Sequence, residues 1–259
     1  MRPLSVSELL TVWERGLAEL PFERALTILS SACPEASRGS LVRMSIGRRD
    51  ADLLQLREWT FGPELTLLAA CPACGQTLES VITVAALRAP VDPACDPAID
   101  RADDSAASAL AELTGCCTWR DYEVRFRSPN TEDIARCAGL EPDAGWQKLL
   151  GSCITSVHCR GVALAVDDLP EDVARKVVEE IGAVDPQADT RLDLTCPECR
   201  QQWKEVFDIV SFFWKEIDAW ARRTLCEVHI LARAYGWREN DVLALSAARR
   251  EVYLAMAQA

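Results

Sequence analysis

Two pairs of cysteines carry the strongest chemical signal in this chain of 259 residues. Cys71 and Cys74 form one Cys-x-x-Cys motif, and Cys196 and Cys199 form a second. In such a motif the chain turns back so that both sulfurs can bind one metal ion, and four thiolates are a common ligand set for structural zinc. The sequence therefore predicts a structural Zn²⁺ ion held by these four cysteines.

The residues around each motif indicate how the turn is built. Proline follows the first cysteine of each pair, and Gly75 follows the second cysteine of the first pair. Glycine suits that position because the turn needs a residue that tolerates positive φ. The second motif has Arg200 at the same position, which is expected to weaken its geometry slightly. Because the motifs lie far apart, the prediction requires residues 75–195 to be an insertion between two turns that meet in space.

Two other interpretations of these cysteines stay open. They could be unrelated reduced turns without metal, or one of them could be a redox dithiol. A thioredoxin-like site needs its Cys-x-x-Cys at the start of a helix, which lowers the thiol pKa. Cys71 ends a predicted strand, whereas a predicted helix follows Cys196 closely, so Cys196 is the better redox candidate.

The remaining cysteines and the two histidines give weaker signals. The eight other thiols mostly stand among alanine, leucine and isoleucine, and buried free thiols behave as small hydrophobic groups. They are Cys33, Cys95, Cys116, Cys117, Cys137, Cys153, Cys159 and Cys226. A second metal site or a Cys–His pair would have to use Cys226 with His229, or Cys159 with His158.

Charge and hydropathy exclude several classes of protein. Forty acidic and 28 basic side chains give a net charge of −12, which disfavours binding to nucleic acid and to anionic membranes. No run approaches the roughly 18 apolar residues that span a bilayer, and the first residues do not resemble a signal peptide. We therefore expect a cytoplasmic protein with reduced thiols. No nucleotide-binding loop, nucleophile elbow or metalloprotease motif is present, so the sequence predicts no enzyme.

The elements that must position the cysteines are predicted as follows. Helices are expected over residues 5–31 with a restart at Pro21, and again from Ile46 to Trp59. Extended segments flank the first cysteine turn, which predicts a hairpin, and another extended segment precedes the second turn. The predicted fold class is α+β and mainly α-helical. It combines a zinc-ribbon-like β-hairpin node, formed by the two distant turns, with a long C-terminal helix.

The C-terminal part of the chain is rich in aromatic residues. From Trp203 to Tyr235, apolar residues recur in steps of four and three, which predicts one long helix. Additional aromatic residues widen its apolar face beyond one stripe, which is typical of a helix that packs on several sides or against a partner. Core packing against the N-terminal helices is the alternative. The predicted partner-binding residues are Trp203, Phe207, Phe213, Trp214 and Trp220.

These patterns divide the chain into six segments. They are an N-terminal helical segment (1–62), the first cysteine hairpin (63–90), an acidic linker (91–115), a small inserted α/β unit (116–189), the second cysteine turn (190–202) and an aromatic-rich helical module (203–259).

Several stretches together resemble a known family. They are Leu20–Ala25, Gly47–Leu54, the Cys-Pro-x-Cys-Gly turn, Phe126–Asp133, Glu227–Trp237 and Leu243–Ser246. The set resembles the baseplate proteins of the bacteriophage T4 type, whose relatives occur in bacterial operons for contractile phage tails and contractile injection systems. The resemblance implies a non-enzymatic role in assembling the baseplate or central hub, as a structural component or an assembly chaperone, with other tail proteins as partners. A zinc-ribbon adaptor or regulator and a thiol–disulfide oxidoreductase are the alternative functions.

Overall fold

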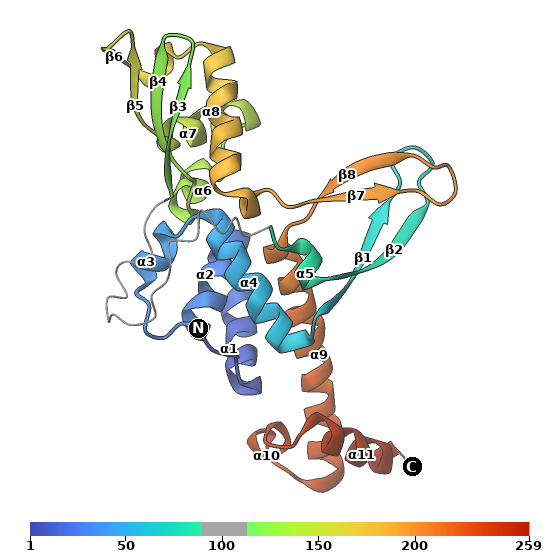
Figure 1. Ribbon diagram of the computed structural model, residues 1–259. Helices are drawn as coiled ribbons and strands as arrows, with labels where there is room; N and C mark the ends of the chain where they lie inside the picture. Colours follow the sequence, from blue (N-terminus) through green and yellow to red (C-terminus); the bar gives the residue numbers. More distant parts are fainter. Residues whose placement is uncertain (90–112, 259) are drawn as a thin grey trace. The chain divides into compact units, whose positions relative to one another are not determined.

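The computed structural model describes residues 1–89 and 113–258, and these form two compact units (Figure 1). The first unit contains Met1–Cys33 and Val210–Ala259, and the second contains Pro34–Ile209. Helices and small antiparallel sheets confirm the predicted α+β class. No helix among the described residues is both long and apolar enough to cross a membrane. Cys95 and most of the predicted acidic linker, 91–115, lie outside the described residues.

The first unit pairs the N-terminal helices with the C-terminal ones. Its elements are α1 (Val6–Gly16), α2 (Pro21–Ala32), α9 (Ile209–Tyr235), α10 (Glu239–Leu243) and α11 (Ala247–Gln258). The indole nitrogen of Trp13 donates a hydrogen bond of 2.8 Å to Asp218. The ring of Trp214 lies against Gly16, where an added Cβ would come within 2.4 Å of it. Helix α9 therefore depends on a glycine in α1 for its close approach.

The C-terminal end of α9 has its own small core. Val228 and Leu231 of α9 pack with Val242 of α10. Tyr235, Trp237 and Tyr253 contact one another, with ring centroids 4.8–5.9 Å apart. The break between α9 and α10 falls at Gly236, which has φ of 69°. These contacts hold α10 and α11 against the end of α9.

One helix of the second unit is capped at its first turn in the interior. The first three helices of this unit are α3 (Arg38–Arg43), α4 (Ile46–Phe61) and α5 (Val84–Leu87), and the N-cap residue of α4, Ser45, is buried. The carboxylate of Asp185, which lies 5% exposed at the end of another helix, accepts a 3.0 Å hydrogen bond from the Gly47 N–H in the first turn of α4. A Cβ at Gly47 would lie 1.9 Å from that carboxylate, so only glycine fits there. A carboxylate at a helix N-terminus also interacts favourably with the helix dipole.

A four-stranded antiparallel sheet is formed by the chain between the two pairs of strands that carry the cysteine turns. Its strands are β3 (Thr114–Trp119), β4 (Tyr122–Arg127), β5 (Ile154–Cys159) and β6 (Val162–Leu164), in that order. Helix α8 (Glu171–Val184) packs on the sheet and contributes Val173 and Val177 to a core with Val124, Phe126 and Val157. Helices α6 (Thr131–Cys137) and α7 (Pro142–Cys153) connect β4 to β5. Helical turns η1 (Val166–Asp168) and η2 (Pro186–Ala188) flank α8.

The side chain of Gln187 forms hydrogen bonds with residues that precede the sheet in the chain and with a residue that follows it. The Gln187 side chain donates to the Leu87 carbonyl (3.1 Å) and to the Thr190 hydroxyl (2.8 Å), and it accepts from the Ala89 N–H (2.7 Å). Leu87 and Ala89 precede the sheet in the chain, whereas Thr190 follows it. Gln187 therefore links the segment that precedes the sheet to the segment that follows it.

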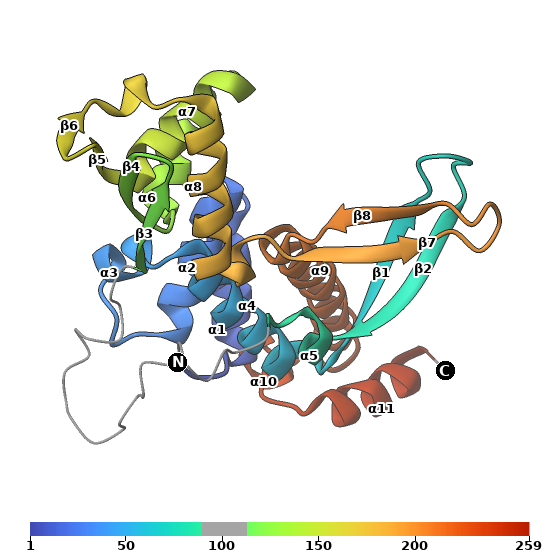
Figure 2. The same ribbon diagram turned by 45° about the horizontal axis from the view of Figure 1, so that its top comes forward.

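Two separate hairpins complete the second unit. Strands β1 (Glu64–Ala70) and β2 (Thr77–Thr83) pair with each other, and so do β7 (Arg191–Thr195) and β8 (Gln202–Val206) (Figure 2). The prediction that the long helix begins at Trp203 is wrong, because Trp203 pairs with Leu194 in β8 and α9 begins only at Ile209. The physical reason is that β7 needs a partner for its backbone hydrogen bonds, and Gln202–Val206 supplies it.

Candidate metal centre

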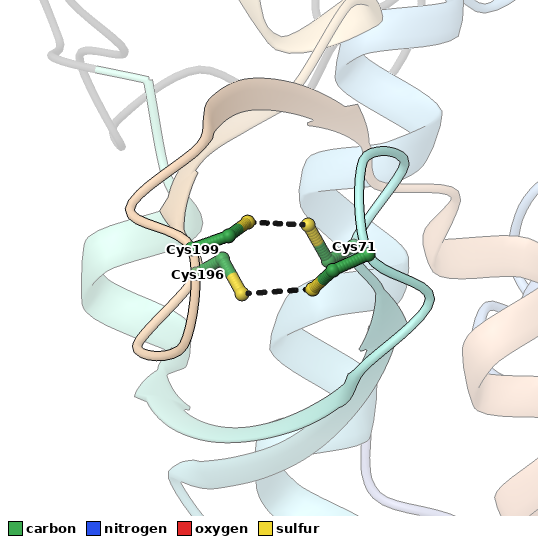
Figure 3. A group of neighbouring side chains, drawn as sticks. Cys71, Cys196 and Cys199 are labelled. Carbon is green, nitrogen blue, oxygen red and sulfur yellow. Dashed lines mark hydrogen bonds between the residues drawn. The ribbon is translucent and has the colours of Figure 1, made fainter.

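The four predicted ligands meet between the two hairpins. The sulfurs of Cys71, Cys74, Cys196 and Cys199 all lie within 4.8 Å of one another. Cys71 directly follows β1, and Cys196 directly follows β7. Each motif therefore forms the turn at the tip of one hairpin. Figure 3 shows Cys196 and Cys199 facing Cys71 across the space between the hairpins. The prediction that these distant turns come together is confirmed.

The sulfur–sulfur distances suit a tetrahedral metal ion. The Cys71 and Cys199 sulfurs are 3.6 Å apart, and so are those of Cys74 and Cys196. Ligands at a Zn–S distance of about 2.3 Å define a tetrahedron whose edge is about 3.8 Å. A disulfide would bring two sulfurs to about 2.05 Å, and all four cysteines are free thiols here. The donor set and spacing therefore fit zinc.

The two turns have the same backbone hydrogen bonds. Cys71 N–H donates to the Gln76 carbonyl and Gly75 N–H donates to the Cys71 carbonyl, at 2.8 and 2.9 Å. In the second turn the equivalent bonds join Cys196 to Gln201 and Arg200 to Cys196, at 2.9 and 3.0 Å. The proline after each first cysteine fits this shared turn, which aims both sulfurs of a motif to the same side.

One cysteine of each motif is buried and the other is exposed. Cys71 is 2% exposed and Cys196 is fully buried, and they form a small core with Leu78 and the half-buried Trp203. Cys74 and Cys199 are exposed. The centre thus has one apolar side, which excludes water, and one side open to solvent through which an ion can enter.

The thiols influence one another's ionisation. Burial opposes ionisation of Cys71, but hydrogen bonds from the backbone N–H groups of Cys74 and Ala73 outweigh it and lower the pKa of Cys71 to about 7. For Cys74 the Gln76 N–H favours the thiolate, yet burial and the three neighbouring thiols raise its pKa to about 12. Four thiolates this close repel one another, and a divalent cation between them would remove that repulsion.

Arg200 adopts the conformation that glycine adopts in the first turn. Its φ is 60°, and the φ of Gly75 is 73°. A residue with a side chain pays about 1–2 kcal/mol for the left-handed region. We expect Arg200→Gly to raise the free energy of unfolding by about 1 kcal/mol in urea denaturation of the zinc-loaded protein.

The matched change is Gly75→Ala in the other turn. No atom lies within 4 Å of a Cβ built at Gly75, so only backbone strain opposes the new methyl group. We expect Gly75→Ala to lower the free energy of unfolding by about 1 kcal/mol. Equal stability of both variants and the parent protein would contradict a shared left-handed turn.

The five predicted partner-binding residues fall in both compact units and differ in burial. Trp203 closes the apolar side of the thiol cluster, and Phe207 lies between β8 and α9. Phe213 is fully buried and Trp214 is 8% exposed in α9, whereas Trp220 is half-buried. Partner binding by these side chains stays a prediction. The structural role of Trp203 beside the cysteines was missed, although its position just after the second turn was a usable signal.

The weaker metal candidates gain no support. His158 and Cys159 are neighbours on β5, and Cys226 and His229 are both exposed on α9. Within residues 1–89 and 113–258, the four cysteines above are the one group of three or more cysteine, histidine or carboxylate side chains placed to hold a metal ion.

Comparison with known proteins gives one family. A family described as T4 bacteriophage base plate protein matches residues 21–214, which is most of the chain and includes both hairpins. No curated protein and no solved structure matches the chain. The family match supports a structural or assembly role in a phage baseplate, with other baseplate or tail proteins as partners. The chain belongs to the family of T4 bacteriophage base plate proteins.

Proposed function

We propose that this protein is a non-enzymatic assembly protein of the baseplate or central hub in a contractile tail or injection system, and that it carries one structural zinc ion. The observation that carries the assembly role is the family match over residues 21–214. The cytoplasm is the compartment where such tails would be assembled, and it keeps thiols reduced and able to bind metal.

The arrangement of the cysteines supports a structural ion over a catalytic one. Four thiolates fill the tetrahedral coordination of zinc and leave no position for a substrate or a water molecule. The ion would supply a positive charge that links β1–β2 to β7–β8. Its ligands are as many as 128 residues apart in the chain. The unfolded chain does not hold the four thiols together, so binding of the ion would stabilise the folded state and fix the two hairpins.

The surroundings of the cysteines give little support to an oxidoreductase. A thioredoxin-like redox site has its Cys-x-x-Cys at the start of a helix. Backbone hydrogen bonds lower the pKa of Cys71, but both motifs lie between strands. Cys71 follows strand β1 and its turn leads into β2, and the turn after Cys196 leads into β8. The helix expected after Cys196 begins only at Ile209. The neighbouring strands instead fit the paired knuckles of a ribbon-like node.

We also propose that the part of the chain between the hairpins is an inserted unit, near residues 116–189. Strands β3–β6 and helix α8 share one hydrophobic core, which supports an independent unit. Gln187 forms hydrogen bonds both with the segment that follows the first hairpin and with Thr190, which precedes the second hairpin. The other segment boundaries stay proposals of the same kind.

The assembly role is tested by deleting the gene from a host that produces these tails. We expect the other tail proteins to be made, but no tails with complete baseplates to form, and expression of the protein from a plasmid to restore them. Electron microscopy of particles and immunoblots of tail proteins give the readout. Normal tails from the deletion strain would overturn the proposal.

A second measurement separates a component from a chaperone. Mass spectrometry of purified tails, with peptides of a known baseplate protein as the internal standard, shows whether this chain stays in the finished particle. A fixed stoichiometry identifies a structural component. Absence from complete particles, together with the deletion phenotype, identifies an assembly chaperone.

A further inference from the structure

Helix α9, the long C-terminal helix labelled in Figure 1, has an exposed stripe of residues on the side opposite its buried face. The exposed residues recur in steps of four and three, and those of the buried face are half a turn away on the helix. We call this set the α9 stripe: Lys215, Ala219, Arg222, Cys226, His229 and Arg233, all exposed. The buried face consists of Phe213, Ile217, Ala221, Thr224, Val228 and Leu231.

The α9 stripe is positively charged in an acidic protein. It contains three cations and no carboxylate, and Arg223 adds a fourth exposed cation at its edge, whereas the whole chain has a net charge of −12. Arg222 pairs with Asp218 at 2.9 Å. Lys215, Arg223 and Arg233 form no salt bridge within the described part of the chain. Three cations therefore remain available to anionic groups on another molecule.

The spacing of the α9 stripe suits another helix. Residues in steps of four and three lie along one face of a helix, so a second helix lying along α9 could contact all of them. Ala219 and Cys226 are small and stand between the cations, so a second helix can approach closely at these points. From Lys215 to Arg233 the stripe runs about 27 Å, which is five turns of helix.

We propose that the α9 stripe binds an acidic α-helix of a partner baseplate protein, one that carries glutamate or aspartate at heptad spacing. This inference rests on the proposed assembly role for the existence of such a partner. The cations of the α9 stripe would pair with carboxylates of the partner helix. Ala219 and Cys226 would let that helix approach α9 closely. Charge complementarity of this kind increases association rates and selects among partners.

Nucleic acid fits the same surface less well. A phosphate backbone would meet a single narrow line of cations on a molecule whose remaining charge repels it. The small apolar residues between the cations would gain nothing from a sugar–phosphate backbone. They do offer packing to a helix, and we therefore favour a protein partner.

The test measures binding of three fluorescent probes to the full chain by anisotropy. The first probe is a 21-residue helical peptide with glutamates at heptad spacing and alanines between them. The second has the same composition in scrambled order, and the third is a DNA duplex of equal charge. We expect the heptad peptide to bind at least tenfold more tightly than either of the others, with affinity that falls as salt rises.

Variants locate the binding site. The triple variant Lys215→Glu, Arg223→Glu, Arg233→Glu should weaken the heptad peptide at least tenfold. A control triple, Arg15→Glu, Arg38→Glu, Arg249→Glu, changes the net charge equally at exposed positions away from the stripe and should bind like the parent protein. Circular dichroism establishes that both triple variants remain folded.

Three outcomes would overturn the inference. They are equal binding of the scrambled peptide, equal or tighter binding of the DNA, and unchanged peptide binding by the α9 triple variant. None of them would alter the tail phenotype of the gene deletion. Failure of this inference is therefore distinguishable from failure of the assembly role.

Discussion

Replacing Cys71 by serine should remove the bound zinc and lower the stability of the protein by several kcal/mol. Cys71 is 2% exposed and its sulfur lies 3.6 Å from that of Cys199. Among the described residues no histidine, carboxylate or further cysteine belongs to the group of four, so none stands ready to replace it as a ligand. Structural zinc contributes about 10–16 kcal/mol of apparent binding free energy in small peptides. We expect the zinc content to fall from about one per chain to below about a tenth. A loss of several kcal/mol corresponds to a fall in Tm of about 10 °C or more.

The measurement combines metal analysis with a thiol count and a thermal melt. Protein purified without chelator is analysed for zinc, and its reactive thiols are counted before and after denaturation. The four cysteines of the centre should be protected in the native parent protein, and the three that remain in the variant, Cys74, Cys196 and Cys199, should be reactive. A chelator should lower the Tm of the parent protein to that of the variant and leave the variant itself unchanged.

Cys226→Ser is the matched control for this experiment. Cys226 is exposed on α9 and lies outside the group of four thiols. Its substitution should change neither the zinc content nor the Tm. Full zinc content and an unchanged Tm in Cys71→Ser would refute the structural centre, and the family assignment would then stand without it.

The cluster of four cysteines could be predicted from sequence because its signal is local. Each Cys-x-x-Cys turn is specified within six residues, from the first cysteine to the return of the chain at Gln76 or Gln201. Arg200 shows the limit of that signal. The sequence suggests a weakened second turn, yet Arg200 adopts the left-handed conformation and the hydrogen bonds of the two turns agree. Arg200 therefore adopts the positive φ that the turn requires, at an energetic cost, and the turn keeps its hydrogen bonds.

The long-range features could not be predicted in the same way. Trp203 fits both a helical stripe and a strand, and the pairing with Leu194 across the turn decides between them. Likewise nothing near Gly47 in the sequence indicates that Asp185, 138 residues away, caps its helix. Periodicity describes which face of an element is apolar. It does not describe which distant backbone group will need a partner.

The second large effect is expected at Asp133, at the start of α6. Its carboxylate is fully buried and accepts two hydrogen bonds from the Arg127 guanidinium, at 2.6 and 2.8 Å. It also accepts from the Asn130 N–H at 3.0 Å, and Asn130 in turn caps the helix. Asp133→Asn keeps the shape of the side chain but removes the buried negative charge that faces the Arg127 guanidinium. We expect a loss of about 3–5 kcal/mol in the free energy of unfolding at pH 7.

The pH dependence of this loss provides an independent check. Burial opposes ionisation of Asp133, but the Arg127 and Asn130 hydrogen bonds outweigh it and hold the pKa of the carboxyl below its ordinary value. A carboxyl whose pKa is lowered by folding stabilises the protein fully at neutral pH, and the stabilisation is lost as the pH falls below about 4. Urea denaturation at pH 7 and at pH 4 and below should therefore show a difference between parent and variant that shrinks in acid.

A variant of the neighbouring residue, Glu132, is the control, because Glu132 forms an exposed ion pair and Asp133 a buried one. Glu132 pairs with Arg136 on the same helix, but their side chains are 46% and 51% exposed. Water screens such a pair, so Glu132→Gln should cost less than about 1 kcal/mol and change little with pH. If Asp133→Asn were no more harmful than Glu132→Gln, the burial of Asp133 would not make its pair with Arg127 important for stability. The junction between β4 and α6 would then depend on hydrophobic packing alone.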